Sequence, residues 1–231
     1  MQTLEFSRSD HVAVVLAHPD DELMLGNGLS TAVEQAGSVT VVTLTAGTNS
    51  TVGPREFVQS GGRLTEQEAS LTALKIAEDD QLQGTYLDES LGAPDIIDDA
   101  AAWIEQITRQ RGINRYITLG RRGVDKHADH VGSHRIATLS AGRLLSSDIA
   151  IDLLALNHLH RGQLHAPHRP GLKDDIIDFH RSQDLRRPDV AQKLGALLHS
   201  GETYDRIQPA ALPRPLRAAG LASAIRRSRA A

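Results

Sequence analysis

The sequence predicts an α/β fold in which a mostly parallel, Rossmann-like sheet lies between two layers of helices. Short valine-rich runs, typical of buried strands, alternate with amphipathic helical segments between residues 11 and 157. The first unit, over residues 12–44, reads strand, helix, strand, and a helical crossover of this kind joins parallel strands. Ligands bind beyond the carboxyl ends of the strands in such sheets, so we expect the functional site at that edge.

The first unit can be followed residue by residue. Residues 12–17 read Val-Ala-Val-Val-Leu-Ala and predict a buried strand. Pro19 suits the first turn of the next helix, which should end near Gly37, and residues 39–44 predict the second strand. Residues 46–62 are rich in glycine and have little periodicity, which predicts a long loop that is either functional or disordered.

The alternation continues along the rest of the chain. We expect helices over residues 63–77, 94–112, 127–144, 173–183 and 189–198, and strands at 86–87, 116–119 and 149–156. Loops are expected at residues 120–126 and 158–171. We expect one domain over residues 1–207, followed by an arginine- and alanine-rich tail over residues 208–231 that belongs to the same unit or forms an oligomer contact.

Composition narrows the classes of function. The 231 residues are 40% hydrophobic and 23% charged, as in ordinary globular proteins. A net charge of −4 gives no general attraction to nucleic acid or to anionic membranes. The chain has no cysteine, so histidine and carboxylate side chains are its available metal ligands. No signal peptide or membrane span is recognised, which predicts a cytoplasmic protein.

Three acids and a histidine follow the first predicted strand, in the order His18-Pro19-Asp20-Asp21-Glu22. Charged side chains at the end of a buried strand are costly unless they are paired or bound to a metal ion. A divalent cation at this position satisfies them. A second explanation is that the acids complement the dipole at the start of the next helix, which leaves His18 unexplained.

A second cluster, His127-Ala128-Asp129-His130, opens a later predicted helix, and His134 follows. Helical spacing would place its three histidines on one face. Because both clusters follow strands of one parallel sheet, they should meet at the same edge. His18, one of the two adjacent aspartates and one histidine of the second cluster supply the donor set of a catalytic zinc with an open position for water. The other aspartate is then placed as the general base.

Several residues also have simpler structural explanations. Asp129 either orients a ligand or lies at the surface, and His134 either supports the ligands from behind or lies at the surface. Arg63 and Glu66, taken alone, form an ion pair on an exposed helical face. The four histidines between His158 and His168 predict an exposed loop, which would form a rim of the substrate site.

The two clusters resemble motifs of the PIG-L/LmbE family of zinc-dependent N-deacetylases. Ala17-His18-Pro19-Asp20-Asp21-Glu22 is similar to the first motif of that family, and His127-x-Asp129-His130 resembles its His-Pro-Asp-His motif. The resemblance covers residues 11–207 and also includes Leu44-Thr45-Ala46-Gly47, Arg63 with Glu66, Ala73-Leu74, Asp88, Lys173 and Ser182-Gln183.

The resemblance implies a zinc-dependent hydrolase that removes an N-acetyl group from an N-acetylglucosamine-like small molecule. It implies His18, Asp21 and His130 as ligands of Zn²⁺, for which other divalent cations such as Fe²⁺ could substitute. It further implies Asp20 as the general base and His127 as the acid or electrostatic partner.

Arg63 and Asp88 would contact the sugar by the same resemblance. The chain departs from the usual family pattern at Thr48, Lys75, Asp125 and Ala128, so the resemblance does not identify the substrate.

Three other functions were compared with this one. A non-haem Fe(II) oxygenase would use His18, Asp20 and His130, but such enzymes are double-stranded β-helices, whereas this chain alternates helix and strand. A nucleotide-binding Rossmann module requires a Gly-x-Gly-x-x-Gly turn after the first strand, where this chain has His18-Pro19-Asp20. A non-catalytic sugar-binding protein would not need both Asp20 and His127.

Overall fold

The computed structural model describes all residues except 125, 158, 160, 187–199 and 211–231. Its strands are β1 (Gln2–Thr3), β2 (His11–Leu16), β3 (Ser38–Thr45), β4 (Gln81–Tyr86), β5 (Arg115–Thr118), β6 (Asp152–Leu156), β7 (Leu164–Ala166) and β8 (Glu202–Ile207). Its helices are α1 (Gly26–Gln35), α2 (Arg55–Gln59), α3 (Gly62–Ala73), α4 (Pro94–Arg111), α5 (Ala128–Leu145) and α6 (Leu172–Ile177), with 3₁₀ turns η1 (Asp21–Leu25), η2 (Glu78–Asp80) and η3 (Arg181–Gln183).

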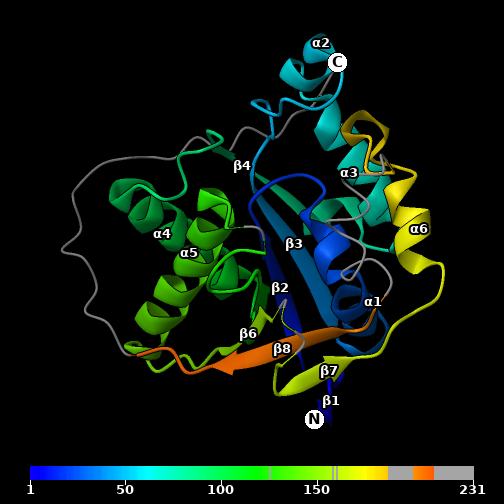
Figure 1. Ribbon diagram of the computed structural model, residues 1–231. Coiled ribbons are helices and arrows are strands. Elements are labelled where there is room, and N and C mark those ends of the chain that lie inside the picture. Colours follow the sequence, from blue (N-terminus) through cyan, green and yellow to red (C-terminus); the bar gives the residue numbers. More distant parts are fainter. Residues whose placement is uncertain (125, 158, 160, 187–199, 211–231) are drawn as a thin grey trace.

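The eight strands form one mixed sheet in the order β1-β7-β8-β6-β5-β2-β3-β4 (Figure 1). Strands β2 to β6 are parallel to their neighbours among themselves, and β1 is parallel to β7. Only β8 runs antiparallel to its partners, which are β6 and β7. The predicted α/β class with a mostly parallel central sheet is confirmed.

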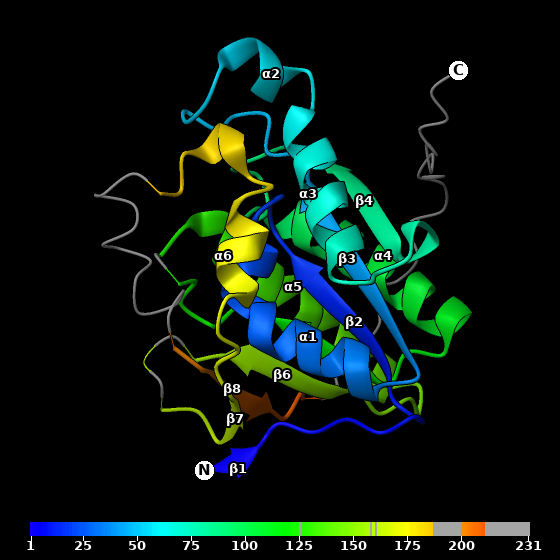
Figure 2. The same cartoon turned by 90° about the vertical axis from the view of Figure 1, so that its right-hand side faces the viewer.

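Helices cover both faces of the sheet. Helices α4 and α5 lie on one face, and α1, α3 and α6 lie on the other, as the two views show (Figures 1 and 2). Alternate residues of β2 pack into the two resulting cores, because successive strand residues point to opposite faces. Val12, Val14 and Leu16 join the core beneath α1 and α6, whereas Ala13 and Val15 join the core beneath α4 and α5.

The start, the end and the buried face of helix α4 can all be explained from its local sequence. Pro94 is its first residue, where the missing N–H costs nothing, and Gly112 follows it with φ of 63°, a conformation that glycine adopts without strain. Ala100, Ile104 and Ile107 are buried on one side against the sheet core. The predicted helix between Pro94 and Gly112 is confirmed.

The segment after the first strand differs from the prediction. The helix begins as the 3₁₀ turn η1 at Asp21, so Pro19 lies outside it, and α1 starts only at Gly26. Asp20 precedes the turn with a left-handed backbone, φ of 105°. Residues 46–62, predicted as an open loop, contain the short helix α2.

The carboxyl-terminal third also differs. The predicted loop over residues 158–171 contains β7, and β8 has no predicted counterpart. The first has only three residues, and the second reads Glu-Thr-Tyr-Asp-Arg-Ile, which is too polar to resemble a strand inside a sheet. The helix predicted over residues 173–183 is divided into α6 and η3. The helix predicted over residues 189–198 lies outside the described residues.

The prediction on domain organisation remains as it was. The division between a domain over residues 1–207 and a tail over residues 208–231 is still a prediction, because residues 211–231 lie outside the described part. Within the described part, no helix combines the length and the apolar character needed to cross a bilayer.

Candidate metal centre and active site

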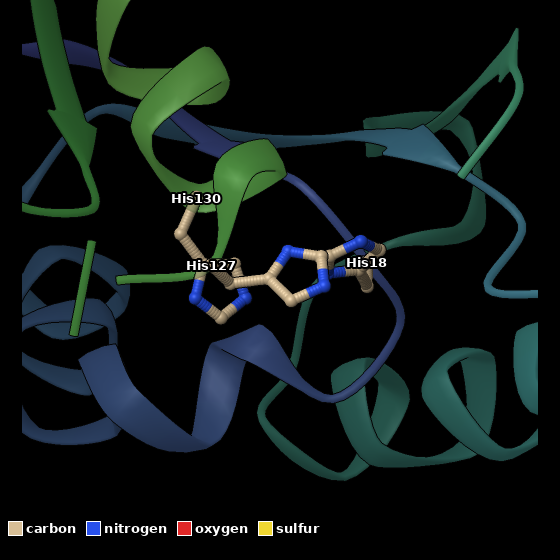
Figure 3. A group of neighbouring side chains, drawn as sticks. All are labelled: His18, His127 and His130. Carbon is tan, nitrogen blue, oxygen red and sulfur yellow. The ribbon is translucent and has the colours of Figure 1, made fainter. Parts of the chain in front are cut away.

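The two histidine clusters meet at the carboxyl edge of the sheet. His18 follows β2, and His127 is the residue that caps the start of α5. Because β2 pairs with β5 in parallel, the segments that leave both strands emerge at the same edge. The imidazole centroids of His18, His127 and His130 lie 5.0–5.2 Å apart, and one nitrogen from each ring lies within 4.8 Å of the others (Figure 3).

Asp21 is held beside these rings by the main chain. Its Oδ2 accepts hydrogen bonds from the N–H groups of Ala17 and His18, both at 2.9 Å. Its Oδ1 lies 3.1 Å from Nε2 of His130. Burial alone would raise the pKa of Asp21, which is only 2% exposed, but His130 and His18 hold that pKa well below its ordinary value. Asp21 is therefore a fixed anion facing a histidine.

Asp129 orients His18 from the other side. Its Oδ2 accepts from Nε2 of His18 at 3.0 Å and from the N–H of Glu89 at 2.6 Å, and its Oδ1 accepts from the N–H of Leu91 at 3.0 Å. Burial opposes ionisation, but these donors keep the pKa of Asp129 below its ordinary value. Since a carboxylate only accepts, Nε2 of His18 carries a proton, and Nδ1 is the ring nitrogen that can bind a metal ion when the ring is neutral.

Asp20 lies in a different environment from its neighbour. Its Oδ1 lies 2.9 Å from Nη2 of Arg63, and its left-handed backbone is uncommon for any residue other than glycine. Burial raises the pKa of Asp20 above its ordinary value, and Arg63 only partly opposes this. Strained backbone of this kind is concentrated at functional sites.

Arg63 does not form the predicted exposed ion pair with Glu66. Its side chain is buried, pairs with Asp20 and donates to the carbonyl groups of Gly47 at 3.1 Å and Pro19 at 2.5 Å. Glu66 instead accepts from the main-chain N–H and the hydroxyl of Ser182. Arg63 thus ties two loops together at the edge of the sheet.

A cavity of about 420 Å³ opens onto these groups. It is lined by His18, Asp20, Asp21, Leu23, Met24, Asn49, Ser50, Thr51, Val52, Arg63, Asp88, Glu89, Val124, His127, His130, Gln183 and Leu185. All seven residues to which the family resemblance gave a role therefore line one cavity, and the roles themselves stay predictions. The glycine-rich loop over residues 46–62 contributes residues 49–52 to the cavity wall.

Asp88 also fixes part of the cavity wall. Its carboxylate accepts from the N–H groups of Gly47 at 3.0 Å and Asn49 at 2.6 Å, so it shapes the loop that follows β3. Contact of Asp88 with a substrate stays a prediction.

The histidines outside this group are placed differently. The predicted stripe of three histidines on one helix is wrong, because His127 precedes α5 and the buried His134 bonds through Nδ1 to the carbonyl of Leu119 at 3.1 Å. His165 and His168 are not among the cavity-lining residues, so the predicted histidine rim is not formed by them. His158 and His160 lie outside the described residues.

Sequence reasoning gave no role to several residues of the site. Glu89 and Leu91 supply main-chain donors to Asp129, which side-chain motifs do not reveal. Gln183 entered only through the family resemblance, yet it lines the cavity and accepts a hydrogen bond from Ser50 at 3.1 Å.

The architecture is that of a parallel α/β protein with a histidine and carboxylate centre at the carboxyl edge of its sheet. Residues 13–141, more than half of the chain, match the family model PIG-L, described as GlcNAc-PI de-N-acetylase. The chain belongs to the PIG-L family.

One curated relative is 1D-myo-inositol 2-acetamido-2-deoxy-alpha-D-glucopyranoside deacetylase 1 of Catenulispora acidiphila. It is 30% identical over 151 residues, which are 55% of this chain and 47% of the relative. The match thus spans about half the length of that protein.

Solved structures support the fold. N,N'-diacetylchitobiose deacetylase from Pyrococcus horikoshii superposes with a TM-score of 0.68 at 19% identity, over 87% of this chain and 84% of that one. The 4-carboxy-2-hydroxymuconate hydratase of Pseudomonas putida superposes with a TM-score of 0.61 at 14% identity, over 90% and 100% of the two chains. At these identities the likeness establishes architecture, and the activity has to be argued from the site.

Proposed function

We propose that this protein is a zinc-dependent hydrolase that removes an N-acetyl group from an amino-sugar-like small molecule. The observation that carries the proposal is the approach of Asp21 to His130, 3.1 Å between Oδ1 and Nε2, beside His18 in the cavity lining. Two imidazoles and one carboxylate are a donor set of catalytic zinc sites. Family membership and the deacetylase relative point to the same chemistry.

The donors fit a metal ion in their orientation as well as in their type. Asp129 leaves Nδ1 of His18 as its available nitrogen, and a carboxylate bonded to the far side of a ligand histidine is a common support of metal sites. The main-chain bonds to Asp21 Oδ2 leave Oδ1 turned toward His130. We assign the metal to His18, Asp21 and His130, which leaves a position open for water.

His127 offers a competing ligand set, because its ring also lies within reach of His18 and His130. We assign it to catalysis because Asp21 is buried and held by the main chain, whereas His127 is half-buried at the cavity wall. The metal content of single variants separates the two sets. Loss of zinc in His127→Ala with retention in Asp21→Ala would replace Asp21 by His127 as the third ligand.

Zinc, when bound, acidifies water toward a pKa of about 7 and polarises a carbonyl group. Asp20 lines the cavity next to the proposed ligand Asp21 and is assigned to accept the proton of the attacking water. His127, on the opposite segment, is assigned to stabilise the negative charge that develops on the carbonyl oxygen. An amine leaves poorly without a proton, which either Asp20 or His127 then supplies.

The proposed substrate is an N-acetylated sugar conjugate, by analogy with the relatives. Asp88, Asn49 and Gln183 line the cavity and carry groups that can bond to hydroxyl groups. Arg63 already binds Asp20, Gly47 and Pro19, so we expect it to bind the sugar only through donors left over from these contacts.

The test is release of acetate from a panel of N-acetylated sugars, including acetylglucosaminyl inositol and diacetylchitobiose. Each compound is incubated with protein that has been stripped by a chelator and then reloaded with zinc, and with the stripped protein as control. We expect release only after reloading. Absence of release from every compound by fully zinc-loaded protein would contradict the proposal, and oxygen uptake by iron-loaded protein would favour the oxygenase alternative.

A further inference from the structure

A second acid and histidine pair lies behind the cavity wall. Glu22, in η1, and His180, which precedes η3, are 0% and 1% exposed, and their Oε1 and Nε2 atoms are 2.5 Å apart. Neither residue is among those that line the cavity. They are 158 positions apart in the chain, and His180 lies beyond residue 141, where the family match ends.

The carboxylate of Glu22 reaches the main chain of the active-site turn. Its Oε2 accepts from the N–H of Asp20 at 3.2 Å and from Gln67 at 3.2 Å, and its Oε1 accepts from Ser70 at 2.8 Å. The N–H that it binds belongs to the residue with the left-handed backbone. Such a conformation persists when surrounding contacts fix it, and Glu22 supplies one of them.

The side chain of His180 forms its hydrogen bond with Glu22. The Nδ1 atom of His180 has no hydrogen-bond partner among the described residues, so its ring bonds to the protein through Nε2 alone. Burial would lower the pKa of His180, but the carboxylates of Glu22, Asp20 and Glu66, with Glu22 foremost, together raise it above its ordinary value. A carboxylate buried as deeply as Glu22 requires a partner of this kind.

The segment of residues 180–183, which His180 begins, reaches the cavity wall at Gln183. Ser182 binds Glu66 of α3, and Gln183 binds Ser50 in the loop after β3. His180 is thus the first of three side-chain attachments between this segment and the elements around the cavity.

We propose that His180, acting through Glu22, is a positioning residue that holds the turn at Asp20 so that its carboxylate stays in the cavity. This inference rests on the proposed hydrolase function. Asp21 has its own bonds to Ala17 and His18, so the metal ligands do not depend on this pair. Loss of His180 is therefore expected to slow turnover without removing zinc.

The experiment compares three substitutions in the full chain. His180→Leu keeps bulk and removes the donor, and His180→Gln restores a donor to Glu22. Glu202→Gln is the matched control, since Glu202 is 1% exposed, lies 2.6 Å from Lys173 and accepts main-chain N–H groups of Asn27 and Gly28 away from the cavity. For each we would measure kcat, KM, zinc content, Tm and, by NMR on metal-free protein, exchange of the Asp20 amide proton.

We expect His180→Leu to lower kcat by about 10–100-fold, as for other supporting residues of metal sites, with KM and zinc content near wild type. Exchange at Asp20 should accelerate, and His180→Gln should restore most of both properties. Glu202→Gln should lower Tm while kcat changes less than about threefold, because its network does not reach the catalytic turn.

Two results would overturn the inference. One is a His180→Leu protein with lowered Tm and normal kcat, which would make the pair purely structural; the other is loss of zinc, which would show that it acts on the ligands. If His180→Leu does not fold, Glu22→Gln is read by the same criteria. If wild-type protein releases no acetate, the proposed function fails, and unchanged exchange at Asp20 would separately refute the positioning role.

Discussion

Asp20→Asn tests the proposed general base with little change of shape. Oδ1 of Asp20 lies 2.9 Å from Arg63, and an asparagine oxygen can accept the same hydrogen bond. Asparagine also tolerates positive φ better than most residues, which matters at a φ of 105°. The substitution therefore removes the proton acceptor and retains the turn.

The expected rate loss follows from the role. A positioned general base contributes about 10²–10⁴-fold, so the barrier should rise by about 2.7–5.4 kcal/mol. Zinc content should be unchanged, since Asp20 is not among the proposed ligands.

The folding stability of Asp20→Asn should not fall with its rate, and we expect it to stay equal or rise. A pKa raised in the folded state means that ionised Asp20 is less stable folded than unfolded, a cost that grows as the pH rises above the unfolded value. Metal-free Asp20→Asn should thus have an equal or higher Tm at pH 7.

The assay is acetate release at saturating substrate, with zinc measured by atomic spectroscopy and Tm measured in the presence of chelator. Asp20→Ala is the companion variant: it also loses the base, but unlike asparagine it leaves no side-chain oxygen to accept from the buried Arg63, so it should have a lower Tm. Turnover of Asp20→Asn within about tenfold of wild type would exclude Asp20 as the base. Loss of zinc would instead make Asp20 a ligand.

Three further predictions concern the metal site. Asp21→Ala and His130→Ala should each lose zinc, which dialysis followed by metal analysis measures, and a fully loaded variant would show that the ligand assignment is wrong. His127→Ala should keep zinc and lower kcat, so an unchanged kcat would leave His127 without a catalytic role. Asp129→Asn should weaken zinc binding by about 10–100-fold, measured by competition with a chelator. The pKa of Asp129 is lowered in the folded state, so its contribution to stability is fully present above an unfolded pKa of about 4 and is lost as the pH falls below it, through the lower folded-state pKa. Asp129→Asn should flatten this acid-side decline in the Tm of metal-free protein.

The elements predicted well are those whose local sequence and environment agree. Strands β2 and β3 are buried on both faces and read as continuous apolar or β-branched runs, and α4 carries its own start and stop residues. In strand β8 the local sequence and the environment disagree, because the strand lies inside the sheet although its sequence is polar. Its Glu202 is buried only because Lys173, Tyr204 and the main chain at Asn27 satisfy the carboxylate. Those partners are set by the tertiary structure, which no local pattern reports.

The same distinction applies to the candidate site. Topology alone brings His18 and His130 together, because both follow parallel strands that are neighbours in the sheet. Topology does not determine the hydrogen-bond partner of each side chain, because that depends on distances of a few ångströms and on which of several partners is nearest. Arg63 had an acid three residues away in sequence, yet it binds Asp20, 43 residues earlier, because the loop places that carboxylate at 2.9 Å.

Asp20 and Asp21 show why adjacent identical residues can be assigned opposite roles. Asp21 accepts two main-chain hydrogen bonds and faces His130, so its charge is stabilised and it suits a permanent metal ligand. Burial and the neighbouring Asp21 raise the pKa of Asp20 by more than Arg63 and the nearby histidines lower it, so its proton affinity is raised, as a proton acceptor requires. The two side chains are consecutive in the chain, and Asp20, the first of them, has the left-handed backbone. A substitution that relaxed this turn would therefore be expected to impair the base before it affected the ligand.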